Sequence, residues 1–497
     1  MSESSRRHLV IGGGLAGITT ALALADEGLK VTLIEASGRL GGRVGSVTDP
    51  SSGMVLDNCQ HAAFRVYSRF LQFIDRIDAK ESLKIQPRTH LPFIEPGSGR
   101  IAILRTGRLS PPNHMMESML AFPFLTLGDK IGMRRVIKSL NKMTEAERIA
   151  LDGVKFSDWL NQQRQSDAAI SRFWGYFTLA ALNLTAAEAS TCQAAFLFKE
   201  GLFGAKDAFD VACFTKDLTA CIGPPSSLAL SKAGVDVRLN NAARGLLFES
   251  DKCIGVGTKS GEIIADTIIL ATPHRAAQRL LAAVDVGPDS TSIVARMLAR
   301  LGTKSLIGLH ALHKTPVTPA GFTFAAVLDE PIIQMVFNRD AELDESERIE
   351  GRQWISVPVS GADEWLGWTD EQFRSEYMRV LGGLWPDTTE PETFHVIKSR
   401  RATFAPTPGQ HANRPETTAV GHGLYLAGSY VATDWPSTME SAVRSGMMAA
   451  EAIITAKKDG VGVSERFEDW TNRADWPGWP RAPSRGDMRW REWLAPE

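Results

Sequence analysis

The sequence has few of the features that mark secreted, metal-binding or membrane-spanning proteins. Its cysteines form no C-x-x-C pair and no cysteine–histidine pattern: Cys59, Cys192, Cys213, Cys221 and Cys253. Neither a disulfide framework nor a metal site is therefore expected. No apolar run reaches the roughly 18 residues of a spanning helix, and the first residues, MSESSRRHLV, lack the apolar core of a signal peptide. These absences predict a cytoplasmic protein.

An excess of charge of one sign is also missing. The formal net charge is −2, both signs are mixed along the chain, and there is no basic tail or internal repeat. Because proteins that bind nucleic acid usually carry a basic face, nucleic acid is not an expected partner. The length of 497 residues exceeds that of one ordinary core and indicates two or more lobes. The oligomeric state stays open.

The sequence does contain a glycine-rich turn close to its start. This turn has the spacing G-x-G-x-x-G: Gly12, Gly14 and Gly17. The apolar run 8–11 before it is typical of a strand, residues 18–26 after it of a helix, and residues 30–34 of a second strand. Glu35 follows, with Ala36 beside it, at the place where dinucleotide-binding folds hold a ribose hydroxyl. The order predicts a Rossmann-type dinucleotide site.

Each part of this motif has a physical task. Gly12 allows the tight turn, Gly14 lets the backbone approach a pyrophosphate, and Gly17 permits close packing of helix against strand. The helix that starts near Leu15 and Ala16 presents free N–H groups to the anion. A structural unit without a ligand is the alternative interpretation.

A second glycine-rich turn favours one dinucleotide over another. Directly after Glu35 the sequence reads ASGRLGGRVGSV, which contains R-x-G-G-R: Arg39, Gly41, Gly42 and Arg43. A nicotinamide-binding domain has no use for two cations at this place, whereas they suit the phosphates of the longer, folded FAD. We therefore expect FAD as the cofactor, with an exposed basic turn as the alternative.

Residues 423–453 show a comparable order of strand, glycine-containing turn and helix. Residues 424–427 are typical of a strand, and Ser437 to Glu440 have the spacing of a capping box, which predicts a helix that runs to about residue 454. The partial positive charge at the start of that helix would stabilise a reduced flavin. The candidate cofactor-binding residues of this segment are Gly428, Ser429, Asp434, Thr438 and Met439.

Together these motifs resemble those of the flavin-dependent amine oxidase and phytoene desaturase superfamily. The resemblance rests on R-x-G-G-R after the G-x-G-x-x-G unit and on the C-terminal AG…D…P-S-T-x-E-x-A-x-x-S-G segment. It implies an α/β fold, in which a Rossmann-type FAD-binding lobe (1–84, 223–282 and 395–459) accompanies a discontinuous, mixed α+β substrate-binding lobe (85–222 and 283–394). It also implies that backbone near Ala243 holds the adenine. Residues 460–497 form a Trp-rich tail outside both lobes.

Within the superfamily the chain is most similar to the hydroxysqualene dehydroxylases. Residues 57–61 (D-N-C-Q-H) resemble that branch's D-N-G-Q-H, and residues 173–204, 334–340 and 400–409 have counterparts. The chain departs from the branch at four places: Cys59, Cys213-Phe214, Met335 and Asn338. The resemblance implies a hydrophobic isoprenoid substrate and reductive dehydroxylation. A carotenoid-type desaturase and an amine oxidase are alternatives, and a lipid-escort protein without redox activity is disfavoured because both halves of the flavin signature are present.

Few residues are candidates for the chemistry itself. His61 is the first choice for a proton donor, since histidine titrates near neutral pH and the resemblance places its segment close to the flavin. A histidine held by a backbone carbonyl is an equal alternative. Cys59, Asp57 and Arg65 are further candidates, with space filling, turn capping and phosphate pairing as their respective alternatives.

Apolar segments suggest where a lipid would be bound. Aromatic residues between 173 and 198 are candidates for tunnel walls or for core: Phe173, Trp174, Tyr176, Phe177, Phe196 and Phe198. Residues 115–133 are markedly apolar and are followed by Arg134, Arg135, Lys138 and Lys142. This pattern fits either an interfacial helix that contacts a membrane surface or a buried amphipathic helix with a cationic outer face. Peripheral contact with the inner membrane face is thus an expectation alongside the cytoplasmic one.

Overall fold

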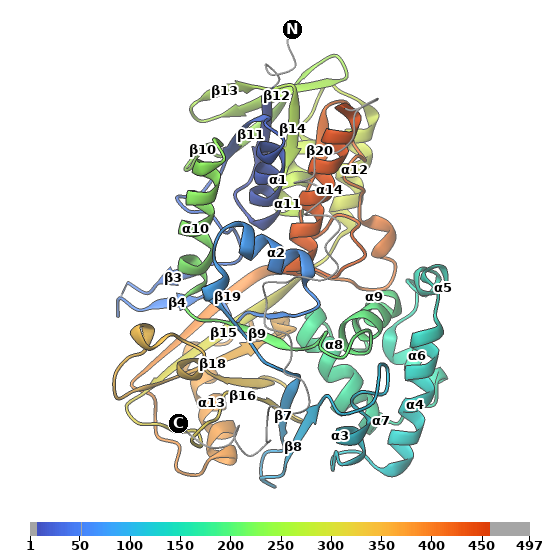
Figure 1. Cartoon of the computed structure of the whole chain (residues 1–497), viewed down its shortest axis with the longest axis vertical. Helices are drawn as coiled ribbons and strands as arrows, with labels where there is room; N and C mark the ends of the chain where they lie inside the picture. The colour runs from blue at the N-terminus through green and yellow to red at the C-terminus, as the bar shows by residue number, and fades with distance from the viewer. Residues whose placement is uncertain (1–6, 51, 458–497) are drawn as a thin grey trace.

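The computed structural model describes residues 7–50 and 52–457, and it folds into two lobes stacked along the long axis of the molecule (Figure 1). The upper lobe is built on a parallel sheet with the strand order β10-β2-β1-β14-β20. Its strands are β10 (Asp236–Arg238), β2 (Lys30–Ile34), β1 (Arg7–Ile11), β14 (Thr267–Leu270) and β20 (Leu424–Leu426). The apolar side chains of β1 and β14 are fully buried, which is typical of central parallel strands covered on both faces.

Two helices from opposite ends of the sequence pack together on this sheet. Helix α1 (Leu15–Asp26) follows the first glycine-rich turn, and α14 (Met439–Lys457) ends the described chain. They approach so closely that a Cβ added to Gly446 would lie 2.4 Å from the carbonyl oxygen of Ala16. The N-terminal and C-terminal motifs of the sequence therefore belong to one site.

Further elements complete the upper lobe. An antiparallel sheet of β11 (Ala243–Glu249), β12 (Lys252–Thr258) and β13 (Gly261–Ile264) lies at its top. Around the central sheet lie α2 (Ser68–Arg76), α10 (Leu218–Lys232), α11 (His274–Ala282) and α12 (Asp289–Arg300).

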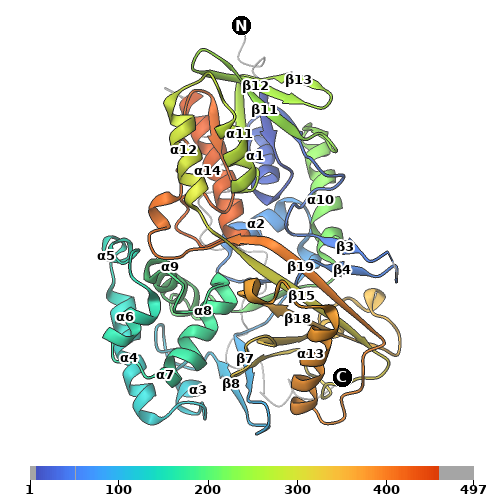
Figure 2. The same ribbon diagram turned by 180° about the vertical axis from the view of Figure 1, so that it is seen from behind.

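The lower lobe consists of a seven-stranded sheet with a helical layer beside it (Figure 2). In the order β19-β15-β18-β17-β16-β7-β8 the strands are β19 (Thr393–Phe404), β15 (Thr303–His313), β18 (Gln353–Val359), β17 (Met335–Asn338), β16 (Phe324–Val327), β7 (His90–Ile94) and β8 (Ile101–Arg105). Helix α13 (Asp370–Leu384) packs against β19. The helical layer contains α3 (Met116–Leu120), α4 (Leu127–Lys142), α5 (Glu145–Ala150), α6 (Phe156–Gln162), α7 (Asp167–Ala169), α8 (Gly175–Leu182) and α9 (Thr191–Phe196).

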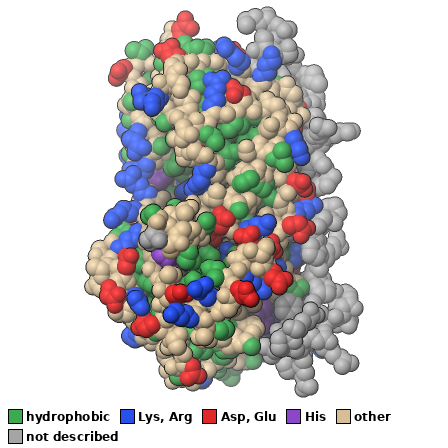
Figure 3. Space-filling view, turned by 90° about the vertical axis from the view of Figure 1, so that its left-hand side faces the viewer, with side chains coloured by type: hydrophobic (Ala, Val, Ile, Leu, Met, Phe, Trp, Pro, Cys, Tyr) green, Lys and Arg blue, Asp and Glu red, His purple; other side chains and the backbone are tan. Residues whose placement is uncertain are grey.

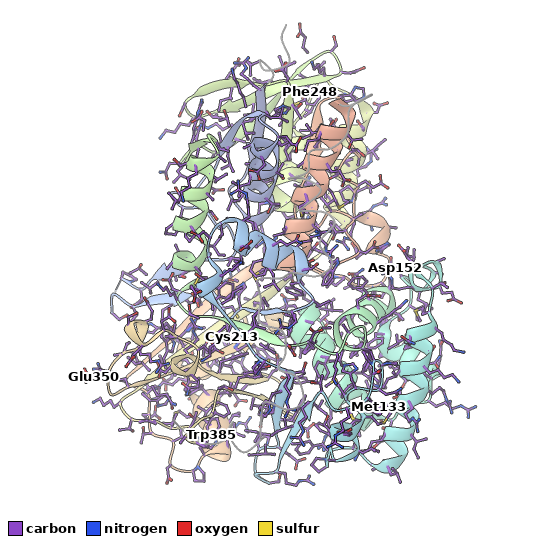
Figure 4. All side chains as sticks on the ribbon, viewed as in Figure 1. Met133, Asp152, Cys213, Phe248, Glu350 and Trp385 are labelled. Atoms are coloured by element: carbon purple, nitrogen blue, oxygen red, sulfur yellow. The ribbon has the colours of Figure 1, made fainter. Side chains whose placement is uncertain are left out.

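Short strands join the lobes. Strands β5 (Ala62–Phe64), β9 (Val211–Phe214) and β6 (Leu83–Ile85) form a small sheet at the waist, where Cys213 is labelled in Figure 4. A hairpin of β3 (Ser46–Thr48) and β4 (Val55–Asp57) projects beside it. The two long strands β15 and β19 run from the lower sheet toward the upper lobe (Figure 2).

The structure places some segments differently from the lobe boundaries expected from the sequence. Strand β19 pairs with β15 in the lower sheet although residues 395–404 were expected in the FAD-binding lobe. Helix α12 packs against α11 of the upper lobe although its residues were expected in the substrate-binding lobe. Near both β19 and α12 the chain passes from one lobe to the other. Local sequence patterns do not indicate at which residue this happens.

The start of α14 also differs from the expected capping box. The hydroxyl of Thr438 accepts a hydrogen bond from the Ser441 N–H (3.2 Å). The fully buried Glu440 carboxylate instead accepts from the Phe70 N–H (2.8 Å) and the Arg69 N–H (3.3 Å), at the start of α2. The expected reciprocal cap at Glu440 was therefore wrong, because this side chain caps a second helix that is distant in sequence.

No helix in residues 7–50 and 52–457 is both long enough and apolar enough to cross a membrane. The apolar segment 115–133 forms α3, a connecting loop and the first half of α4. The Trp-rich tail at 460–497 lies outside the described residues.

Candidate functional site

One cavity of about 1220 Å³ extends from the glycine-rich turns of the upper lobe into the lower lobe. Pockets for a single small ligand usually measure roughly 300–1,000 Å³. The larger volume indicates space for a cofactor together with a second molecule. The polar end of the cavity is lined by the β1–α1 turn and the start of α14, and the apolar end by β7, α8, β16 and β17.

The first glycine-rich turn has the geometry that a dinucleotide cradle requires. Gly12 has φ +117°, and a Cβ at Gly17 would lie 1.9 Å from the Gly12 carbonyl oxygen. A Cβ at Gly14 would meet no atom closer than 3.9 Å, because this residue starts α1 at the cavity wall. The turn therefore presents bare backbone and a helix N-terminus to the cavity, which suits a pyrophosphate. Leu15 and Ala16 also line it, whereas Gly17 lies behind the wall.

The expected ribose-binding acid lies at the same end. One carboxylate oxygen of Glu35 accepts a hydrogen bond from the Gly13 N–H (2.7 Å), and the other accepts from the Ser37 N–H (2.8 Å). Ala36 and Ala243 line the cavity beside it. Two polar atoms here are buried and have no hydrogen-bond partner among the described residues, namely Asn241 Oδ1 and Thr272 Oγ1. Since buried polar atoms are normally satisfied, both mark positions where a ligand would bind.

The second glycine-rich turn lies directly on the first. The Gly41 N–H donates to the carbonyl of Gly13 (2.9 Å), and a Cβ at Gly42 would lie 2.9 Å from the Gly14 Cα. The guanidinium of Arg43 donates to the Ala402 carbonyl (2.8 Å) and to the Ser429 hydroxyl (3.0 Å). Arg43 thereby joins the N-terminal turns to the C-terminal loop.

Charge at this end is strongly one-sided. Arg43 lines the cavity, and desolvation by the surrounding protein lowers the pKa of its guanidinium. The arginines that line the cavity are Arg39, Arg43, Arg244, Arg279 and Arg401. Glu35 is the one acidic residue among the described residues of the wall. An excess of cations of this kind fits the phosphates of a dinucleotide.

The C-terminal loop closes the cradle. Gly428 has φ +143°, and its N–H donates to the Ser445 hydroxyl of α14 (2.8 Å). Ser429, Thr438 and Met439 line the cavity beside it. Asp434 lies outside the wall with φ +64° and pairs with Arg148 of the helical layer at 3.0 Å. Asp434 thus fixes the loop against the lower lobe and does not contact the cavity.

The segment 57–61 lies where the polar and apolar ends meet. The imidazole of His61 lines the cavity, and its Nδ1 lies 2.8 Å from the carbonyl oxygen of Cys59. A carbonyl only accepts, so Nδ1 carries the hydrogen and Nε2 is left to accept a hydrogen bond. Burial lowers the pKa of His61, which keeps the ring neutral at pH 7. Burial also raises the pKa of Cys59 to about 12, so this cavity-lining thiol stays protonated.

Two of the candidate catalytic residues lie behind the cavity wall. Asp57 is buried and accepts from the Ser46 hydroxyl (2.8 Å) and the Leu218 N–H (2.8 Å), and burial raises its pKa. Arg65 donates through Nε to Asp210 at 3.0 Å. Neither residue lines the cavity, so Asp57 and Arg65 support the cavity wall from behind and do not contact a molecule bound in it.

A buried ionic cluster holds the 57–61 segment in place. The Arg339 side chain is 2% exposed and pairs with Glu342 (2.8 Å) and Asp57 (3.5 Å). Glu342 also accepts from the Gln60 amide (2.9 Å), while Gln60 Oε1 is buried without a hydrogen-bond partner among the described residues. No local sequence pattern indicates this cluster, because its members come from β4, from the turn that follows it, and from a short helix at 339–341 with the residue directly after that helix.

The apolar end contains no charged side chain among its described wall residues from β7, α8, β16 and β17. Tyr176 and Phe177, two of the aromatic residues named from the sequence, line it. Phe173, Trp174 and Phe198 are fully buried in the core instead. The remaining one, Phe196, packs against Trp435 outside the cavity. Sequence reasoning missed the contributions of Phe93, Phe324 and Phe337, which reach the wall from separate strands.

Comparison with known proteins agrees with this geometry. Residues 15–454 match the family described as flavin containing amine oxidoreductase. The chain belongs to this family. It is therefore a flavoenzyme, an oxidoreductase whose cofactor is FAD, and the two glycine-rich turns, the arginines and the unpaired polar atoms described above fit that cofactor.

Individual relatives cover almost the whole chain. Hydroxysqualene dehydroxylase of Rhodopseudomonas palustris is 25% identical over 90% of this chain and 98% of its own length. The 15-cis-phytoene desaturase of Capsicum annuum is 23% identical over 92% of this chain and 79% of its own. A crystal structure of an oxidoreductase from Methanosarcina mazei has a TM-score of 0.69 at 16% identity, covering 90% of this chain and 100% of its own. The last likeness supports the α/β fold alone.

Proposed function

We propose that this flavoenzyme acts on a long isoprenoid, and that its reaction is the reductive dehydroxylation of hydroxysqualene to squalene. The observation that carries the proposal is the single cavity that leads from the cofactor cradle into an uncharged, aromatic-lined chamber. A hydrocarbon chain is held in such a chamber by burial of apolar surface, at roughly 25 cal/mol per Å². The similarity to three hydroxysqualene dehydroxylases at 24–25% identity supports the same substrate class.

The reaction would replace a carbon–oxygen bond by a carbon–hydrogen bond. One hydride and one proton are consumed and one water is released. Reduced FAD supplies the hydride when it is bound. The protein must hold the allylic carbon next to the cofactor, keep bulk water out and protonate the departing oxygen.

His61 is the titratable side chain placed for the last task. Its Nε2 accepts a hydrogen bond from the substrate hydroxyl while Nδ1 remains fixed on the Cys59 carbonyl (2.8 Å). Because burial lowers the pKa of His61, only a small fraction is protonated at pH 7, and that fraction is a strong donor. If His61 delivers the proton, the rate rises about tenfold for each pH unit of acidification above that pKa.

The neutral ring favours one alternative reaction. A neutral imidazole accepts protons, so the same residue suits a carotenoid-type desaturase, which removes hydrogen from its substrate. In that reaction the rate falls on acidification. An amine oxidase is less well supported, because the apolar end of the described cavity wall offers no carboxylate for a cationic substrate.

The experiment uses the purified, FAD-loaded protein under anaerobic conditions. The flavin is reduced, hydroxysqualene is added, and flavin absorbance is followed while the extracted lipids are analysed. We expect reoxidation with stoichiometric squalene, a rate that rises as the pH falls from about 8 to about 6, and loss of that pH dependence in His61→Asn. Reduced flavin that ignores hydroxysqualene, combined with oxidised flavin that becomes reduced by a carotene precursor, would replace the proposal by the desaturase reaction.

A further inference from the structure

A group of large apolar side chains is exposed at one corner of the lower lobe. We call it the α3–α4 corner and define it by five residues: Ile101, Leu109, Leu120, Leu127 and Ile131. Leu127 and Ile131 are 66% and 62% exposed and lie one turn apart on the same face of α4. Lys130 Nζ donates to the Leu120 carbonyl at 2.8 Å, which brings the end of α3 beside the start of α4. Strand β8 and α3 lie together at the bottom of the molecule (Figures 1 and 2).

Core packing does not explain these exposed side chains. The inner face of α4 is already occupied by Met133, Val136 and Leu140, all of them buried. Met133 lies among the helices of the lower lobe in Figure 4. The outward-facing Leu127 and Ile131 therefore form a second apolar face, which a soluble helix does not require.

Cations adjoin the apolar face on the same helix. Helix α4 contains five basic residues, Lys130, Arg134, Arg135, Lys138 and Lys142, and a single acidic one, Asp129. The Asp129 carboxylate is already engaged in the capping box with Thr126. Arg134, Arg135, Lys138 and Lys142 are exposed. Apolar residues followed by a cluster of cations match the boundary between the acyl region and the anionic headgroups of a bilayer.

The corner also lies over the apolar end of the cavity. Phe93 lines the cavity, and its ring centroid is 5.2 Å from that of Phe122 in the loop between α3 and α4. Phe122 in turn packs on Phe124 at 5.1 Å. Ala121 and Pro123, which alternate with these rings, are exposed. One aromatic layer thus separates the cavity from the exposed apolar surface.

From these observations we infer that the α3–α4 corner binds the surface of an anionic lipid bilayer. Leu120, Leu127 and Ile131 insert among the acyl chains, and the cations of α4 contact the lipid phosphates. The loop at 121–124 then faces the bilayer above the apolar end of the cavity. For the isoprenoid substrate, and resting on the proposed function, this loop is the place of passage between the bilayer and the cavity.

The test is sedimentation of the full-length, FAD-loaded protein with vesicles of phosphatidylcholine alone and with about 30% phosphatidylglycerol. We expect clear binding to the anionic vesicles, weakened by raising the salt from about 0.1 M to about 0.5 M. The variant L120D/L127D/I131D should lose about tenfold or more in affinity for them. The variant R134E/R135E/K138E should bind both vesicle types equally weakly.

The chain offers a matched control at the other end of the molecule. Leu228, Val286 and Ile293 are 55%, 70% and 49% exposed and lie on or beside α10 and α12 of the upper lobe. On the α10 side of the molecule, charged side chains of both signs are interspersed with scattered apolar ones (Figure 3). L228D/V286D/I293D adds the same charge and should bind vesicles as the unchanged protein does. Equal binding of anionic vesicles by L120D/L127D/I131D and L228D/V286D/I293D would overturn the inference.

Folding and activity are controlled separately. Each variant should keep the flavin absorbance spectrum and the unfolding temperature of the unchanged protein, because the replaced side chains are exposed. With detergent-dispersed substrate, the corner variant should turn over at the unchanged rate and lose rate only with substrate presented in vesicles. If no preparation turns over hydroxysqualene, the proposed function fails while the vesicle result still decides the inference.

Discussion

Replacing Arg339 by methionine tests whether the buried ionic cluster holds the 57–61 segment. Arg339 is 2% exposed and pairs with Glu342 at 2.8 Å and with Asp57 at 3.5 Å. It also donates to the Phe214 carbonyl (3.1 Å). Methionine fills a similar volume but leaves two buried carboxylates without their cation. Removing one partner of a buried pair costs roughly 3–5 kcal/mol, so we expect a loss of that size in the free energy of unfolding.

The assay is urea unfolding of the FAD-loaded protein, followed by circular dichroism and by release of the flavin. The matched control is Arg352→Met, which removes an arginine–carboxylate pair whose side chains are 42% and 29% exposed. Exposed pairs contribute about 1 kcal/mol or less, so this variant should unfold nearly as the unchanged protein does. Equal effects of the two substitutions would refute the assignment of the cluster as a buried anchor.

Acidity provides a second check on the same variant. Burial raises the pKa of both Asp57 and Glu342, and the charge of Arg339 is the largest of the influences that oppose this rise. Without Arg339 both folded-state values move further above the unfolded ones. A carboxyl with a raised folded-state pKa stabilises the protein at low pH, and that contribution disappears as the pH rises through its folded pKa. The deficit of Arg339→Met should therefore shrink from pH 8 to pH 5, and Glu342→Gln should partly rescue the variant at pH 8.

Three other substitutions test the cofactor cradle (Gly17→Ala), a buried histidine (His310→Asn) and the cap of α2 (Glu440→Ala). Gly17→Ala should abolish FAD binding, since its Cβ would lie 1.9 Å from a backbone oxygen of the β1–α1 turn; Gly153→Ala, where a Cβ meets nothing within 4 Å, should retain the flavin absorbance. Burial lowers the pKa of His310 to about 3, so only the unfolded state gains a proton between pH 6 and pH 4. The free energy of unfolding should therefore fall as the pH is lowered. In His310→Asn this dependence on pH should be smaller by about 1.4 kcal/mol per pH unit. Equal pH dependences of the two proteins in urea unfolding would contradict the expectation. Glu440→Ala should lower the free energy of unfolding by about 1–3 kcal/mol, because α2 loses its cap and the half-buried Arg444 loses its carboxylate partner. Glu451→Ala, on the exposed side of the same helix, should change the free energy of unfolding little.

The cofactor end was predictable because its determinants are local. Glycine at positions 12, 14 and 17 has a meaning within one strand–turn–helix unit, and the structure places β1, α1 and β2 within a few residues of the predicted bounds. The R-x-G-G-R turn is similar, since it folds directly back onto the first turn. Charge and glycine spacing alone thus indicate a phosphate-binding surface before any long-range contact is known.

The substrate end was not predictable because long-range pairing creates it. Its wall combines strands β7, β16 and β17 with α8. Strand β16 (Phe324–Val327) pairs in parallel with β7 (His90–Ile94), although the two strands lie far apart in the sequence. The aromatic residues between 173 and 198 were expected either in a tunnel wall or in the core, and their pattern did not distinguish Phe177 in the wall from Phe173 in the core. Both residues are fully or nearly fully buried without ligand, so a burial pattern carries no information on which of them faces a cavity.

The four positions at which the chain departs from the motifs that it resembles occupy different places in the structure. Cys59 and Met335 line the cavity, whereas Cys213 and Asn338 do not. The thiol of Cys59 and the flexible thioether of Met335 contribute to the cavity wall, and neither residue belongs to the glycine-rich turns of the cradle. Of these positions, only Cys59 and Met335 are therefore placed to contact a molecule bound in the cavity.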